Sequence, residues 1–231
     1  MITVRKSDDR GKTKLEWLDS KHTFSFGDYF DPKWMGFKSL RVINEDVVEA
    51  GQGFSPHPHK DMEIITYIVE GSLQHKDNSG GGTIIHTGEV QKMSAGTGII
   101  HSEFNPSQIE IVHLLQIWII PEKKGLTPMY EQKVFSTQDK QGKLLLIGSK
   151  DGRQGSIQIH QDVNLYSSYL KKGDDLTYSF DQGRGGWLQV ITGELQVNDQ
   201  TLSAGDGAQI SGESEIHIQC LEPSELLFFD L

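Results

Sequence analysis

Cysteine and long apolar segments are scarce in this chain. Its 231 residues include one cysteine, Cys220, which excludes an intramolecular disulfide and is typical of a reducing, cytoplasmic compartment. The longest apolar run, residues 111–120, contains His113 and Gln116 and has about half the length that a membrane-spanning helix needs. The N-terminus turns polar at once and lacks the apolar core of a signal peptide. We therefore expect a cytoplasmic protein with no membrane partner.

Positive charge is also in short supply. The chain has 22 Lys and Arg residues against 32 Asp and Glu residues, a formal net charge of -10. A phosphate backbone would need a local basic patch, and the sequence contains no run of basic residues. We therefore expect no nucleic-acid partner.

What the chain does have is glycine and short, β-branched apolar segments. There are 25 glycines, and strand-like segments cover residues 40–44, 64–69 and 112–119. The last of these is almost continuously apolar, as in a strand buried on both faces. Turn residues such as 78–82 lie between the segments. The pattern predicts an all-β chain.

The second half of the chain repeats the first in outline. Residues 187–196 align with residues 65–74 at an offset of 122, the difference between positions 187 and 65. Residues 203–207 likewise resemble residues 94–98. We infer two antiparallel β-barrels from one duplicated unit. The polar stretch 121–128 predicts a boundary between a barrel of residues 1–125 and one of residues 126–231, with exchange of a strand between them allowed.

Three histidines and a glutamate have the spacing of a metal site. Side chains two residues apart on a strand share a face, so His57 pairs with His59, and His101 pairs with Glu103. Three imidazoles and a carboxylate suit one divalent first-row metal, and affinity alone does not choose among Fe, Mn, Co, Ni, Cu and Zn. The absence of thiolate ligands argues against a structural zinc site.

A second carboxylate competes for the metal, and the second half of the chain lacks the imidazoles. Glu63 lies an even number of positions after His59, so on a continuous strand both side chains would share a face. Alternation therefore leaves both Glu63 and Glu103 open as the fourth ligand. At the offset of the repeat, His57 and His59 correspond to Ser179 and Asp181. We therefore predict a metal in the N-terminal barrel and none in the C-terminal one.

The spacing of these residues resembles the two cupin motifs. The motifs run Gly51-x5-His57-x-His59-x3-Glu63-x7-Gly71 and Gly98-x2-His101-x3-Asn105. Gly96 stands where many cupins have proline, and the interval from Glu63 to Gly71 is one residue longer than usual. More narrowly, residues 22–32, 57–63, 96–103 and 159–162 resemble the pirin family, and the likeness covers nearly the whole chain.

The resemblance to pirins implies a bicupin of jelly-roll barrels that are packed together, with one metal in the N-terminal barrel. The metal, usually iron and here expected as Fe(II), is implied to be held by His57, His59, His101 and Glu103. In many cupins the residue matching Glu63 is the carboxylate ligand, whereas in pirins it is the residue matching Glu103. We predict Glu103 as the ligand and Glu63 as a hydrogen-bond acceptor that orients an imidazole.

Some bacterial pirins open the central ring of quercetin with O2 and release carbon monoxide. The resemblance therefore predicts a quercetin 2,3-dioxygenase-type oxidoreductase acting on a flavonol-like substrate and O2. Glu103 is predicted to take the proton of the flavonol hydroxyl. Two alternatives remain. One is a regulatory protein whose metal senses redox state and alters the affinity for a protein partner, and the other is a non-oxidative cupin enzyme.

The remaining histidines are interpreted as structural or surface residues: His22, His75, His86, His113, His160 and His217. The aromatic residues Phe24, Phe26, Tyr29 and Phe30 are interpreted as an N-terminal strand that seals a barrel, with a flavonoid-sized pocket as the alternative.

Overall fold

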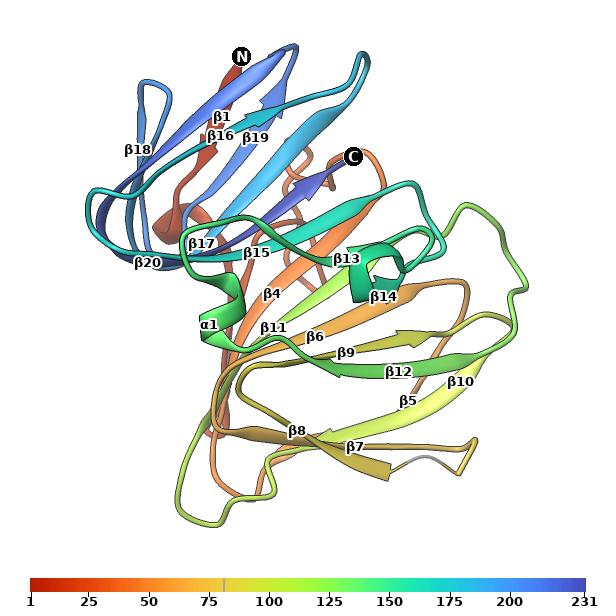
Figure 1. Ribbon diagram of the computed structural model, residues 1–231. Helices are drawn as coiled ribbons and strands as arrows, with labels where there is room; N and C mark the ends of the chain where they lie inside the picture. The colour runs from red at the N-terminus through yellow and green to blue at the C-terminus, as the bar shows by residue number, and fades with distance from the viewer. Residues whose placement is uncertain (81) are drawn as a thin grey trace. The chain divides into compact units, whose positions relative to one another are not determined.

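The computed structural model describes residues 1–80 and 82–231, which fold almost entirely into β-strands (Figure 1). The prediction of an all-β chain is confirmed. The chain divides into two compact units. The N-terminal unit comprises Gly11–Phe135 with Ile159–Gln161, and the C-terminal unit comprises Met1–Arg10, Ser136–Gln158 and Asp162–Leu231. Within the described residues, no helix is long and apolar enough to cross a membrane.

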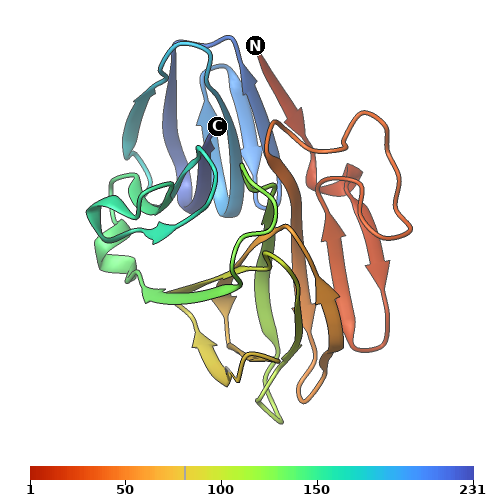
Figure 2. The same cartoon turned by 90° about the vertical axis from the view of Figure 1, so that its right-hand side faces the viewer.

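The N-terminal unit contains two antiparallel sheets. The larger has the strand order β12-β9-β6-β11-β4-β3-β2 and the smaller the order β5-β10-β7-β8. The larger sheet consists of β2 (Gly11–Lys14), β3 (Leu18–His22), β4 (Leu40–Val48), β6 (Glu63–Glu70), β9 (Glu89–Ser94), β11 (Val112–Ile119) and β12 (Met129–Val134). The smaller consists of β5 (Gly53–His59), β7 (Ser72–Asp77), β8 (Gly82–His86) and β10 (Ile99–Phe104). Figure 2 shows β2 and β3, in red, next to β4.

The predicted closed barrels are not formed, and each unit is built from open sheets. In the N-terminal unit, β12 and β2 are the two edges of the larger sheet, and no hydrogen-bonded ladder joins these described strands. The apolar core lies between the two sheets, because Leu18, Val48 and Ile68 of the larger sheet cluster with Leu73 and Ile85 of the smaller one. Burial between two open sheets therefore replaces closure into a barrel.

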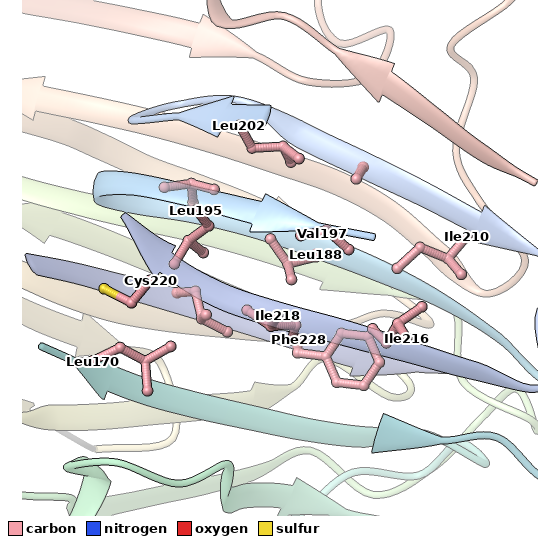
Figure 3. Packing of buried hydrophobic residues seen from close by; sticks show 13 residues of the cluster. Leu170, Leu188, Leu195, Val197, Leu202, Ile210, Ile216, Ile218, Cys220 and Phe228 are labelled. Carbon is pink, nitrogen blue, oxygen red and sulfur yellow. The ribbon is translucent and has the colours of Figure 1, made fainter. Parts of the chain in front are cut away.

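The C-terminal unit has one nine-stranded sheet with the path β1-β19-β17-β20-β15-β13-β14, while β16 pairs with β20 and β18 with β17. The strands are β1 (Ile2–Arg5), β13 (Leu145–Ser149), β14 (Ile157–Gln158), β15 (Asn164–Leu170), β16 (Asp175–Ser179), β17 (Gly185–Val197), β18 (Gln200–Ser203), β19 (Gly207–Ser211) and β20 (Glu215–Asp230). The short helix α1 (Thr137–Lys140) and two 3-10 turns, Ser7–Asp9 and Arg153–Gly155, complete the unit. Figure 3 shows its buried side chains, among them Leu188, Ile218 and the free Cys220.

Two pairings place the division between the units away from residue 125. β12 pairs with β9 from Met129 opposite Ser94 to Val134 opposite Glu89, so the segment after residue 125 belongs to the N-terminal unit. β1 pairs with β19, with Ile2 opposite Ile210, so the first ten residues belong to the C-terminal unit. The composition of the polar stretch 121–128 marks a surface loop, whereas these backbone ladders decide which unit each segment joins.

The two aligned segments share a glycine with the same backbone conformation. Gly71 between β6 and β7 has φ +78°, and Gly193 within β17 has φ +81°. A Cβ at Gly71 would lie 2.5 Å from the carbonyl oxygen of Ile111, and one at Gly193 would lie 2.2 Å from that of Pro223. Glycine is required at both positions because of the positive φ and because a neighbouring backbone is too close for a side chain.

We expect Gly71→Ala to destabilise the protein more than Gly125→Ala. Gly125 has φ +71°, but no atom lies within 4 Å of the position that its Cβ would take, so its substitution adds backbone strain of about 1 kcal/mol without a clash. At Gly71 the carbonyl of Ile111 must also move, which adds about 1–2 kcal/mol. Urea unfolding of both variants measures the difference, and equal losses of unfolding free energy would contradict it.

Candidate metal centre

The candidate metal ligands come from two neighbouring strands of the smaller sheet. β10 pairs with β5, with His101 opposite His57 and Ile99 opposite His59. Residues directly opposite one another in an antiparallel pair point to the same face, so the three histidines share a face. Their ring centroids lie 4.4 Å apart for His57 and His101, 4.8 Å for His57 and His59, and 4.9 Å for His59 and His101. The structure thus brings together the three imidazoles that the sequence paired.

The edge position of β5 explains how this strand accommodates Pro56 and Pro58. β5 pairs with β10 on one side only, so prolines without an N–H do not interrupt a ladder on the other side. The register shifts between His101 opposite His57 and Glu103 opposite Phe54, which indicates a bulge in β5. Bulges of this kind re-aim side chains next to functional sites.

Two ring nitrogens in this cluster have no hydrogen-bond partner among the described residues. Nε2 of His59 and Nε2 of His101 are both buried and unsatisfied. Nδ1 of His57 lies 2.8 Å from the carbonyl oxygen of Ser55 and donates its proton to it, which leaves Nε2 of His57 as a free acceptor. Buried polar atoms are rarely left without a partner, and a metal ion is one partner that three neutral imidazoles can share. The residues present therefore fit a metal ion.

Burial keeps two of these imidazoles neutral. Desolvation lowers the pKa of His59 to about 4, and the neighbouring His101 and His57 contribute to the same shift. Desolvation likewise lowers the pKa of His101 to about 3, with His57 and His75 adding to the effect. Both rings are therefore uncharged at neutral pH, which is the form that binds a metal.

Glu103 lies beside His101 and is held from the facing sheet. It is 2% exposed. Its Oε2 accepts a hydrogen bond from Nε2 of Gln116 at 2.8 Å, and its Oε1 accepts one from the hydroxyl of Thr66 at 3.5 Å. His75, His101 and Glu103 form a second group whose potential ligand atoms lie within 4.8 Å of one another, like those of His57, His59 and His101. Oε1 has the weaker of the two hydrogen bonds and is the oxygen more open to a ligand.

His75 was interpreted from the sequence as an isolated structural residue, but it contacts the site. Nδ1 of His75 lies 3.4 Å from Nδ1 of His101. The contact arises because β7 pairs with β10, with His75 opposite Glu103. No local motif marks this residue, and only the pairing of β7 with β10 reveals it.

The structure places Glu63 in a different cluster. Its Oε2 lies 3.1 Å from both the backbone N and Nδ1 of His160, and 3.4 Å from Nζ of Lys92. Asp61, at φ +50°, turns the chain between β5 and β6, and these two strands join different sheets. The alternation of side chains between two faces is interrupted at such a turn, so Glu63 and His59 do not share a face. Glu63 belongs to neither group of candidate ligands, and these contacts do not support it as an acceptor for a ligand imidazole.

A cavity of about 460 Å³ opens next to His57, His59 and Glu103. Its apolar wall includes Trp17, Leu18, Phe26, Phe54 and Trp118, and its polar wall includes Thr13, Ser20, His22, Asn44, Asp46 and Gln116. Rings of the lining meet edge to face, among them Trp17 with Phe54 at 5.3 Å, Phe26 with Trp118 at 5.4 Å, and His59 with Trp118 at 4.9 Å.

The aromatic segment near the N-terminus forms turns rather than the predicted sealing strand. Its one strand-like contact is a bridge between Phe26 and Tyr29. Phe26 lines the cavity, Phe24 is buried, and Phe30 is 70% exposed. His22 also lines the cavity, with Nδ1 2.8 Å from Oδ1 of Asn44 and Nε2 2.8 Å from the hydroxyl of Thr13. The pocket alternative is therefore correct for Phe26.

Comparison with known proteins identifies the family. Residues 3–119 match the family described as Pirin, and residues 146–231 match the quercetinase C-terminal cupin domain. The quercetin 2,3-dioxygenase of Escherichia coli K12 is 50% identical over 231 residues, covering 100% of this chain and 99% of that protein. A pirin-like protein of Caulobacter vibrioides is 39% identical, with coverage of 100% and 99%. The crystal structure of the E. coli pirin YhhW in complex with nickel(II) matches with a TM-score of 0.96 and 50% identity, covering 100% of this chain and 99% of that one. The predicted resemblance is confirmed, and the chain belongs to the pirin family.

Proposed function

We propose that this protein is a metal-dependent dioxygenase that opens the central ring of quercetin or a related flavonol with O2 and releases carbon monoxide. The observation that carries the proposal is a set of orphaned imidazole nitrogens beside a cavity of substrate size. Sites for small molecules typically enclose about 300–1,000 Å³ and combine apolar walls with a few polar groups. A relative that is 50% identical over the whole chain is named a quercetin 2,3-dioxygenase, which supports this choice of substrate.

His57, His59, His101 and Glu103 are the residues that we propose to hold the metal. The nickel(II) complex of YhhW supports a divalent first-row ion, and we propose Fe(II) as the physiological one. When bound, the metal would supply a Lewis-acidic centre capable of redox chemistry next to the cavity. A metal of coordination number five or six held by three imidazoles and one carboxylate would have one or two positions left for small molecules.

The chain's own groups explain how a flavonol would be oriented and deprotonated. The rings of Trp17, Phe26 and Trp118 offer apolar walls to a planar aromatic molecule. In this proposal Oε1 of Glu103 accepts the proton of the hydroxyl group beside the flavonol carbonyl, because its hydrogen bond from Thr66 is long, whereas Gln116 occupies the other carboxylate oxygen. The polar wall around Asn44 and Asp46 can then bind the remaining phenol groups.

Asp46 on the polar wall is a carboxyl group with a strongly perturbed pKa. Burial raises the pKa of Asp46 to about 7, the hydroxyl of Ser20 opposes the rise by donating a hydrogen bond, and the charges of Glu103 and Glu45 add to it while His113 lowers it. Near neutral pH this group is partly protonated. It can therefore donate to a phenolate or accept from a phenol hydroxyl.

We also propose that the protein is cytoplasmic. The free Cys220 is buried in the core of the C-terminal unit, as expected for a chain that folds without disulfides.

Turnover tests the proposed function directly. We expect protein loaded with Fe(II) under anaerobic conditions to consume quercetin only when O2 is admitted, with carbon monoxide released. The absence of consumption for every flavonol tried would overturn the proposal. Turnover without O2 would instead indicate a non-oxidative cupin enzyme.

We expect Glu103→Gln to lower kcat/KM for quercetin by about 100-fold or more, because the amide cannot take the hydroxyl proton. Elemental analysis measures the metal content of the variant. Low activity with the metal still bound indicates loss of the base, whereas low activity with little metal indicates loss of the ion. Glu110→Gln is the matched control, since it makes the same substitution at an exposed site. Full turnover by Glu103→Gln with bound metal would exclude the assigned role of this carboxylate.

We expect Asp46→Asn to flatten the pH dependence of stability. The folded pKa of about 7 lies above the ordinary pKa of 3.8, so the folded state binds the proton more tightly and stability falls as pH rises from about 4 to 7. The parent protein should lose about 2–3 kcal/mol of unfolding free energy from this group between pH 5 and pH 8, at about 1.4 kcal/mol per pKa unit, and the variant should not. Urea unfolding at the two pH values measures this loss. The exposed Asp19→Asn should behave like the parent protein, and a parent-like Asp46→Asn would contradict the prediction.

A further inference from the structure

The strand next to β10 carries a second pair of buried polar side chains that face the metal centre. β7 pairs with β10, with Asp77 opposite His101 and His75 opposite Glu103. The side chains of His75 and Asp77 are both 0% exposed. Leu73, two residues before His75, lies in the core between the sheets, so this face of β7 points into the N-terminal unit.

These side chains form a continuous chain of short contacts that starts at His101. Nδ1 of His101 lies 3.4 Å from Nδ1 of His75, and Nε2 of His75 lies 3.0 Å from Oδ2 of Asp77. The other oxygen of Asp77, Oδ1, accepts a hydrogen bond from the backbone N of Ser79 at 2.8 Å and another from the Ser79 hydroxyl. The carboxylate of Asp77 is therefore fixed in position, with Oδ2 directed at His75.

For two neutral rings, the carboxylate of Asp77 sets the direction of each hydrogen bond in this chain. A carboxylate only accepts, so the proton between His75 and Asp77 belongs to Nε2 of His75. With one proton on its ring, His75 presents the lone pair of Nδ1, which accepts from Nδ1–H of His101. With one proton on its own ring, His101 then keeps its lone pair on Nε2. That atom is the buried nitrogen without a hydrogen-bond partner among the described residues.

We propose that His75 and Asp77 are positioning residues that hold His101 in the tautomer whose Nε2 is free to bind the metal. This inference rests on the metal site of the proposed function, but not on the identity of the substrate. Carboxylates that hydrogen-bond to a ligand imidazole orient the ring and raise its basicity. Here the carboxylate acts through an intervening histidine.

The main rival is a second metal ion held by His75, His101 and Glu103, whose potential ligand atoms also lie within 4.8 Å of one another. In that arrangement the Nδ1 atoms of His75 and His101 would both be lone-pair donors to an ion. His101 would then carry its proton on Nε2, the buried atom that has no hydrogen-bond partner among the described residues. The two arrangements therefore predict opposite tautomers of His101 and different metal stoichiometries.

The tautomer is measurable on the unmodified, metal-free protein. We expect the ring ¹⁵N chemical shifts at neutral pH to show a proton on Nδ1 of His101 and on Nε2 of His75. A proton on Nε2 of His101 would overturn the proposal. This measurement requires no variant to fold and no substrate to turn over, so it stands apart from any failure of the flavonol assay.

Nickel(II) binding by calorimetry provides the second test. We expect one ion per chain. Binding of two ions, with the second one lost when His75 is substituted, would favour the rival and overturn the proposal. We expect Asp77→Asn to bind nickel(II) about 10–100-fold more weakly. Ser79 donates to Oδ1, so the side-chain oxygen of Asn stays at that position and its amide N–H₂ faces His75. The amide would then donate to Nε2 of His75, which reverses the direction of both hydrogen bonds between this residue, His75 and His101.

The matched control is Glu70→Gln, which removes the same charge from an exposed position at the end of β6. We expect its nickel(II) affinity to stay within about 2-fold of the parent protein, since exposed charges contribute little. A folded Asp77→Asn variant with the affinity of this control would overturn the proposal. A tautomer reversed at His101 in Asp77→Asn, seen in the same ¹⁵N spectra, would support it.

Discussion

The register of β10 against its two neighbours is the constraint on which the proposed metal centre depends. Backbone hydrogen bonds on one side place His101 opposite His57, and those on the other side place it opposite Asp77. Side chains alternate between faces along a strand, so a slip of one residue would turn His101 and Glu103 out of the interior. The same ladders therefore assemble both the imidazole cluster and the His75–Asp77 pair behind it. The bulge in β5 leaves this register intact from His57 onward.

The two sheets of the N-terminal unit contribute different chemistry to the site. The smaller sheet supplies the imidazoles, two of which burial keeps neutral. The larger sheet supplies Gln116 and Thr66, which donate to Glu103 and fix its carboxylate. A second buried glutamate, Glu63, is balanced elsewhere by Lys92 and His160. Glu103 and Glu63 therefore have separate sets of partners, neutral donors for Glu103 and a lysine with a histidine for Glu63.

The alternation of side chains along a strand correctly predicted which residues share a face within β5, but it did not hold across the turn that follows. His57 and His59 lie on β5 without a break, and the structure brings both rings to His101. Glu63 is separated from His59 by the turn at Asp61, and it faces another cluster. The prediction of an all-β pirin was correct, whereas the prediction of closed barrels was wrong, because sequence periodicity describes single strands and not which edges pair.

The sequence by itself determined the all-β class, the family, and the local pairs of residues with metal-binding chemistry. These properties follow from side-chain type and from spacing over a few positions. Only the tertiary structure decided that β7 lies against β10, that His75 contacts His101, and that Phe26, His22 and Asp46 surround one cavity. The physical reason is that strand pairing and sheet packing join residues far apart in the chain. Local patterns carry no record of which strands become neighbours.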